Sequence, residues 1–243
     1  MKKLYEKNEL MFAILSILIY VIGSSIADNL SSEIGIQKIV TLPWNLLLTV
    51  IIAVFVSKNG LSEYYGLCKG KYQAKSYFYF IPLVVISLVN VWFGAAMKYS
   101  AVETVLYVVS MLLVGFLEEM VFRGFLFKAM SRENVKSAII VSSLTFGIGH
   151  FVNLLNGGGA NLLETGCQIV YAVSIGYLFV TLFHKGKSLW PCIISHGVLN
   201  ALSSVSNEAL ATRYLIPVSI ALTVLSLLYA AALNRTMKEA KTV

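Results

Sequence analysis

Two adjacent carboxylates, Glu118 and Glu119, lie within a long apolar stretch, and Arg123 follows shortly after them. On a helix, residues four apart share a face, so Glu119 and Arg123 can form an ion pair that lowers the cost of burying either charge. Successive residues are about 100° apart around a helix, so Glu118 points elsewhere. The spacing therefore predicts that Arg123 holds one carboxylate while the other faces a cavity.

Two further apolar stretches carry imidazole and amide side chains. His150 follows Phe146 by four residues, and Asn200 follows His196 by four, so the members of each pair share a helix face. A carboxylate beside a histidine in a water-accessible pocket can activate water by general-base catalysis. His196 and the Asn200 amide could donate hydrogen bonds to the oxyanion that forms in amide hydrolysis. The residue types thus suggest hydrolysis without a covalent intermediate.

These side chains come from different helices, yet they share one depth. At 1.5 Å per residue, Glu118 lies roughly 15 Å and His196 roughly 13 Å from the inner ends of their helices. His150 and Asn200 lie roughly 21 and 19 Å from theirs. All four fall near the middle of a bilayer about 30 Å thick. Ionisable residues at that depth are costly and usually functional, so we expect one shared site.

The composition explains why a bilayer is the relevant solvent. Of 243 residues, 58% are hydrophobic and 13% are charged, with a mean hydropathy of +0.78, whereas soluble domains carry about 25% charged residues. Each spanning helix needs about 20 mostly apolar residues. The sequence predicts an all-α, polytopic membrane helix bundle, a single domain over 1–243. Its eight expected spans are 10–27, 40–57, 76–97, 101–127, 137–153, 164–183, 189–206 and 214–233.

The positive charges give the orientation of this bundle. Of the 19 Lys and Arg residues, 15 lie in segments on the side of the N-terminus, and Arg123 lies within a span. The opposite side has only Lys38, Lys98 and Arg213. Because cytoplasmic loops are enriched in Lys and Arg, both termini are predicted to be cytoplasmic. An anionic inner leaflet explains the net charge of +7, so the expected partner is the lipid bilayer and not nucleic acid.

Two details of the spans carry further expectations. The very short connection between 76–97 and 101–127 predicts that these two spans pack antiparallel. The first span could also be a signal peptide, because Ser25-Ile26-Ala27 resembles a small-x-small cleavage site. Its apolar stretch is longer than most signal-peptide cores, which favours a retained helix.

Other chemistries fit these residues less well. Cys192 and His196 are also four residues apart, as a nucleophile and its base could be, but a thiol among apolar neighbours is usually inert. One glutamate and two histidines could bind zinc. The sequence has no His-Glu-x-x-His, and Arg123 would oppose a nearby cation. Zinc is therefore not favoured, and no cofactor is expected.

The order and spacing of these residues are similar to three motifs of the CAAX-protease and bacteriocin-processing family of intramembrane glutamyl proteases. The resemblance covers roughly residues 100–205. It implies that Glu119 and Arg123 shape the site and tune Glu118. The matching motifs are Glu118-Glu119-x-x-x-Arg123, Phe146-x-x-x-His150 and His196-x-x-x-Asn200.

The resemblance also implies roles for the remaining residues. Glu118 would activate water with assistance from His150, and His196 and Asn200 would stabilise the oxyanion. The site would lie in a cavity open toward the cytoplasm and would work without a metal. The substrates would be membrane-associated peptides or proteins, either of the CAAX type or in bacteriocin and peptide processing. The use of 15 Lys against 4 Arg is compatible with an AT-rich bacterial genome, which favours a bacterial plasma membrane.

Two other functions stay open at this stage. A non-catalytic membrane regulator or bacteriocin self-immunity protein could use the same bundle for binding, but it would be free to lose the motif residues, which are intact. A small transporter would need polar residues along a path through the membrane, whereas these lie at one depth. The oligomeric state does not follow from the sequence.

Overall fold

The computed structural model describes residues 1–70, 80–154 and 161–237, and within these ranges the fold is helical with no strand. The all-α prediction is confirmed. The longer helices are α2 (Glu9–Ile34), α3 (Thr41–Lys58), α5 (Ala101–Glu118), α7 (Val135–Gly149), α8 (Leu162–Gly186), α9 (Trp190–Leu202) and α11 (Leu215–Thr236). The shorter elements are α1 (Lys2–Lys7), α4 (Ile81–Ser87), η2 (Val89–Val91), η3 (Glu119–Phe127), α6 (Lys128–Ser131), η4 (His150–Leu154), η5 (Ser203–Val205) and α10 (Glu208–Arg213).

Six helical segments of the described chain are long and apolar enough to cross a membrane. Their outward side chains are apolar and exposed, for example Ile26 at 56% and Leu228 at 65%, an arrangement that suits lipid rather than water. The protein is therefore a multi-pass integral membrane protein. Residues 76–79 of the predicted third span lie outside the described ranges, and α4 and α9 have only 7 and 13 residues. The total of eight spans stays a prediction. The six segments are Glu9–Ile34, Thr41–Lys58, Ala101–Ser131, Val135–Leu154, Leu162–Gly186 and Leu215–Thr236.

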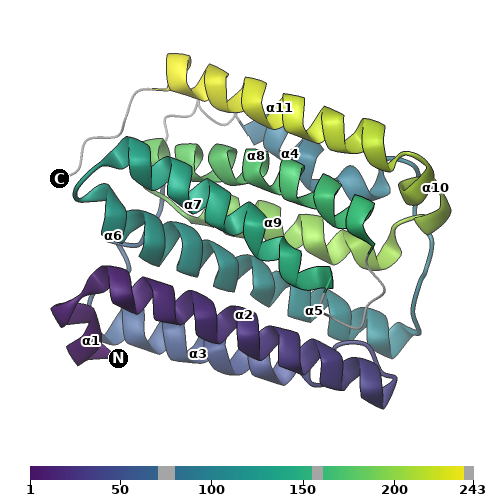
Figure 1. Cartoon of the computed structure of the whole chain (residues 1–243), viewed down its shortest axis with the longest axis horizontal. Coiled ribbons are helices and arrows are strands. Elements are labelled where there is room, and N and C mark those ends of the chain that lie inside the picture. Colours follow the sequence, from purple (N-terminus) through teal and green to yellow (C-terminus); the bar gives the residue numbers. More distant parts are fainter. Residues whose placement is uncertain (71–79, 155–160, 238–243) are drawn as a thin grey trace.

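The bundle has two distinct ends. Helix α1 and the last turn of α11 lie at one end, and the α2–α3 connection lies at the other (Figure 1). We call these the N-terminal end and the Lys38 end. Helix α2 runs from the first to the second, and α3 and α5 run back (Figure 1). The basic segments of the sequence therefore gather at the N-terminal end.

The predicted pairing of the third and fourth spans is wrong. Helix α5 packs against α9 and α3, while α4 packs against the other side of α9. The Asn90 amide of η2 donates to the Leu199 carbonyl of α9 at 2.7 Å. The helical stretch also ends earlier than expected, because Gly94 has a φ of 92°, a conformation that favours glycine. Residues beyond it cross to η5, where the Ala96 N–H donates to the Val205 carbonyl.

The close contact between α5 and α9 depends on Gly115. A Cβ atom at this position would lie 2.6 Å from the Gly197 backbone nitrogen and 2.7 Å from the Gly197 Cα. Small residues allow membrane helices to approach each other closely. This approach matters for the site because Glu118 lies one turn after Gly115, and His196 lies directly before Gly197.

We therefore expect Gly115→Ala to push α5 and α9 apart. Overpacking typically costs about 1–3 kcal/mol, so the unfolding temperature in detergent should fall, and activity should fall with it. Gly166→Ala in α8 is the matched control, because nothing lies within 4 Å of a Cβ there. Equal unfolding temperatures for the two variants would show that the α5–α9 distance is not set by Gly115.

Candidate active site

The helix that carries the paired glutamates changes its geometry at the site. A regular α-helix was predicted over 101–127, but α5 ends at Glu118 and the chain continues as a π-helix over Glu119–Phe127. Every residue of this π-helix is buried. π-helical turns are rare and occur frequently at functional sites. The wider turn places the Glu119 and Arg123 side chains inside the bundle.

Glu119 and Arg123 form the fully buried part of the site. Their Oε1 and Nη1 atoms are 3.1 Å apart, and both side chains have no exposed surface. The Arg123 guanidinium lies 4.0 Å from the centre of the Phe146 ring, a cation–π contact. The same Glu119 oxygen lies 2.9 Å from Nδ1 of His196. Glu119 therefore neutralises Arg123 and orients the His196 ring.

Glu118 borders a cavity. Its Oε1 accepts a hydrogen bond of 2.6 Å from the Tyr20 hydroxyl, and its Oε2 lies 3.4 Å from Nε2 of His196. The His196 imidazole thus lies between the two carboxylates, with one ring nitrogen toward each. Oε2 is buried and accepts no hydrogen bond from the described residues. The pairing expected from the helical spacing is present, with one glutamate held by Arg123 and the other beside the cavity.

His150 and Asn200 lie on the wall of the same cavity as Glu118. The cavity has a volume of about 330 Å³, within the usual range of about 300–1,000 Å³ for ligand sites. His150 begins the 3₁₀ turn η4 after α7, with its ring centre 5.3 Å from that of Phe146. Asn200 lies one turn after His196 on α9. The structure therefore brings all six predicted site residues into one region.

Carboxylates and histidines, which are common metal ligands, meet at this site. Among the described residues, no group of three or more His, Cys, Asp or Glu side chains is arranged to hold a metal ion. Glu119 is already engaged by Arg123 and His196. That catalysis needs no metal remains a prediction, which a chelator tests.

Comparison with known proteins adds independent evidence to this geometry. Residues 100–202 match the family described as type II CAAX prenyl endopeptidase, Rce1-like. We call this matched stretch, residues 100–202, the Rce1-like domain. This finding confirms the resemblance inferred from the three motifs and supports a membrane protease. No curated protein matched the chain.

Part of the site lies outside the Rce1-like domain. Tyr20, which holds Glu118, belongs to α2, as do Ser24 and Asp28, and all three line the cavity. Sequence reasoning missed them, although polar side chains at 20, 24 and 28 repeat every four residues within the first apolar span. Helix α2 also packs against η3 and α3. That the first span is a retained helix stays a prediction.

Replacing Tyr20 tests whether its hydrogen bond to Glu118 of the Rce1-like domain supports activity. Tyr20→Phe removes one hydrogen bond to a carboxylate, worth about 1.5–3 kcal/mol, so kcat should fall about 10- to 100-fold. Tyr177→Phe is the control, since the Tyr177 hydroxyl contacts Asn234 rather than the cavity. A lower rate together with a lower unfolding temperature would mean that Tyr20 only supports packing.

Proposed function

We propose that the protein is an intramembrane endopeptidase that hydrolyses peptide bonds of membrane-associated peptides or proteins with glutamate-activated water. The observation that carries the proposal is the position of Glu118. It borders the cavity, with one oxygen held by Tyr20 and the other without a hydrogen bond from the described residues. Glu119 instead pairs with Arg123. Two neighbouring carboxylates in different environments can take different roles.

The proposed reaction starts with a water molecule in the cavity beside the Glu118 carboxylate. Glu118 accepts a proton from this water as it attacks the scissile carbonyl carbon, and His150 assists from another part of the cavity wall. The Asn200 amide donates to the oxyanion of the tetrahedral intermediate. Nε2 of His196 also donates to it in the imidazolium form, in which Nδ1–H donates to Glu119 at the same time. Glu118 then returns the proton to the leaving amine, and the C–N bond breaks. The peptide and water enter the reaction, and two shorter peptides leave.

Glu119 and Arg123 act in this scheme without touching the substrate. Nδ1 of His196 is fixed by Glu119, so Nε2 faces Glu118. The Arg123 guanidinium offsets the charge of Glu119 inside the bundle, where an unpaired ion would be strongly destabilising. These two residues are therefore positioning residues, and their contribution is the fixed orientation of the groups around Glu118.

The proposed substrates are of the CAAX type or belong to peptide or bacteriocin processing, and the proposed location is a bacterial plasma membrane. The Rce1-like domain supports a membrane protease. The position of the cavity beside mid-membrane residues suits a substrate that is already held at the bilayer. A non-catalytic regulator or immunity protein is the alternative outcome of the experiment below.

The experiment uses the full chain in nanodiscs with a library of peptides, prenylated and unprenylated, and follows cleavage by mass spectrometry. Wild type is compared with Glu118→Ala and His150→Ala, each with and without a chelator. We expect cleavage by wild type alone, with no effect of the chelator. Loss of wild-type cleavage with the chelator would establish a metal requirement. A Glu118→Ala variant that still functions in cells would indicate a binding role instead of an enzyme.

A further inference from the structure

The bundle is closed on the N-terminal side of Glu118 by aromatic side chains. Phe12 of α2 contacts Phe55 of α3 and Phe125 of η3, with ring centres 5.1 and 5.0 Å apart. Tyr65 adds a further edge contact to Phe125 at 5.0 Å. These four rings are at most 6% exposed. Together with the buried π-helix, they fill the described part of the bundle between Glu118 and the N-terminal end with apolar side chains.

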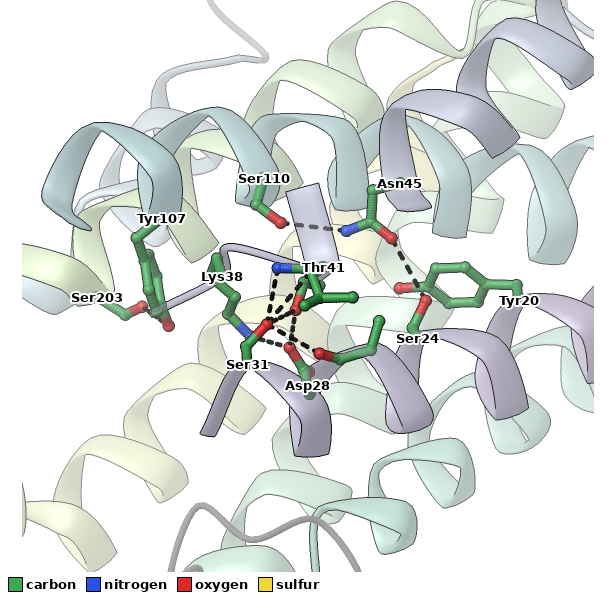
Figure 2. Close-up of polar contacts among 12 residues, drawn as sticks. Tyr20, Ser24, Asp28, Ser31, Lys38, Thr41, Asn45, Tyr107, Ser110 and Ser203 are labelled. Carbon is green, nitrogen blue, oxygen red and sulfur yellow. Dashed lines mark hydrogen bonds and ion pairs between the residues drawn. The ribbon is translucent and has the colours of Figure 1, made fainter. Parts of the chain in front are cut away.

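The opposite side of Glu118 is polar. Tyr20, Ser24 and Asp28 follow one face of α2 from Glu118 toward the Lys38 end, and all three line the cavity (Figure 2). On the facing helix α3, the Asn45 side chain lies 3.3 Å from the Ser24 hydroxyl and donates to Ser110 at 3.1 Å. This wall can be hydrated over its whole length. A transporter would need the polar path to continue past Glu118, where the aromatic rings end it.

Charged and polar groups also surround the far part of the cavity. Asp28 accepts hydrogen bonds from Lys38 Nζ at 2.7 Å and from the Thr41 hydroxyl at 2.6 Å (Figure 2). Tyr107 and Ser203 form another pair there, with their hydroxyls 3.0 Å apart (Figure 2). The Asp28 and Lys38 side chains are 26% and 15% exposed. The part of the cavity nearest the Lys38 end is therefore polar and partly exposed.

The charge distribution then identifies the membrane face of this part of the cavity. Among the described residues, the segments at the Lys38 end contain Lys38, Lys98 and Arg213, whereas 11 basic residues belong to segments at the other end. Under the positive-inside rule, the basic end is cytoplasmic. We infer that the cavity opens on the extracytoplasmic face, and that the peptides cleaved at Glu118 enter from that face. The family resemblance implied a cytoplasmic opening, so these two expectations oppose each other.

The substrate part of this inference rests on the proposed function, whereas the accessibility of the cavity does not. The cleaved segment of a peptide substrate would lie on the extracytoplasmic side of the membrane. A secreted peptide or the extracytoplasmic segment of a membrane-anchored protein meets this condition. Water for hydrolysis would come from the same side. The sidedness can therefore be measured without any cleavage assay.

The test uses thiol labelling in a chain whose Cys68, Cys167 and Cys192 are changed to alanine. Single cysteines are introduced as Ser24→Cys and Ser203→Cys in the cavity. Gln37→Cys and Glu133→Cys mark the exposed surface of the Lys38 end and of the N-terminal end. Intact cells are treated with a membrane-impermeant maleimide, and labelling is read as a mass shift.

We expect both cavity cysteines and Gln37→Cys to react in intact cells, and Glu133→Cys to react only after permeabilisation. Labelling of Glu133→Cys in intact cells, with Gln37→Cys protected, would overturn the orientation. Labelling of Gln37→Cys with both cavity positions protected would overturn the extracytoplasmic opening. Since this readout needs no substrate, a failure of the peptidase proposal would leave it unchanged. If peptides are cleaved, labelling the cavity cysteines should also block that cleavage.

Discussion

Glu118→Gln should reduce peptide cleavage by about 10²–10⁴-fold, the usual contribution of a general base, while the protein stays folded. Glutamine has nearly the same shape as glutamate, and its carbonyl oxygen can still accept the hydrogen bond from Tyr20. It cannot take a proton from water. The measurement is kcat/KM in nanodiscs, together with the unfolding temperature of the same preparation.

The control for this variant is Glu133→Gln, which changes an exposed glutamate in the α6–α7 connection. It should cleave at the wild-type rate. If Glu118→Gln also cleaved at the wild-type rate, another group would have to be the base. If Glu118→Gln instead lowered the unfolding temperature strongly, its loss of activity would carry no information about catalysis.

Glu119→Ala should destabilise the protein by about 3–5 kcal/mol, because it leaves the Arg123 charge buried without a partner. Neither side chain of the pair is exposed, so water cannot replace the lost carboxylate. His196 loses the acceptor of its Nδ1 contact as well. Activity should therefore disappear together with stability. The unfolding temperature in detergent and the cleavage rate measure the two effects.

A double variant separates these two effects. Replacing a buried ion pair by apolar residues is often neutral or stabilising, so Glu119→Ala with Arg123→Met should regain much of the lost stability. Its activity should stay low, because the His196 ring is still unfixed. A double variant no more stable than Glu119→Ala alone would show that the unpaired charge is not the source of the loss.

The sequence was most informative where the chemistry is local. The four-residue spacing of Glu119 and Arg123 predicted their contact, and the shared depth of Glu118, His150 and Asn200 predicted that separate helices meet at one site. Such inferences work because the helical repeat fixes the face and height of each residue. In a bilayer, the cost of burying charge adds a strong reason for these residues to gather.

The sequence was least informative where distant segments meet. The hydrogen bond from Tyr20 to Glu118 joins residues 98 positions apart, and no local pattern specifies that contact. Helix α9 packs between α4 and α5, because Gly115 allows the α9 backbone to approach α5 closely. The short connection between α4 and α5 does not make them neighbours. The π-helix after Glu118 could not be predicted from the sequence either. The residues around the two glutamates are almost all apolar, so they show no spacing that distinguishes a π-helix from an α-helix.

The most direct test of water activation by Glu118 is mass spectrometry of a reaction quenched during turnover in ¹⁸O-labelled water. A peptide substrate of the wild-type protein is incubated with wild type or with Glu118→Gln. The masses of the products and of the intact enzyme are then measured. We predict one ¹⁸O atom in the new C-terminal carboxylate, an enzyme of unchanged mass, and no product with Glu118→Gln. An enzyme carrying the acyl part of the substrate, or equal product from both proteins, would contradict the proposed mechanism.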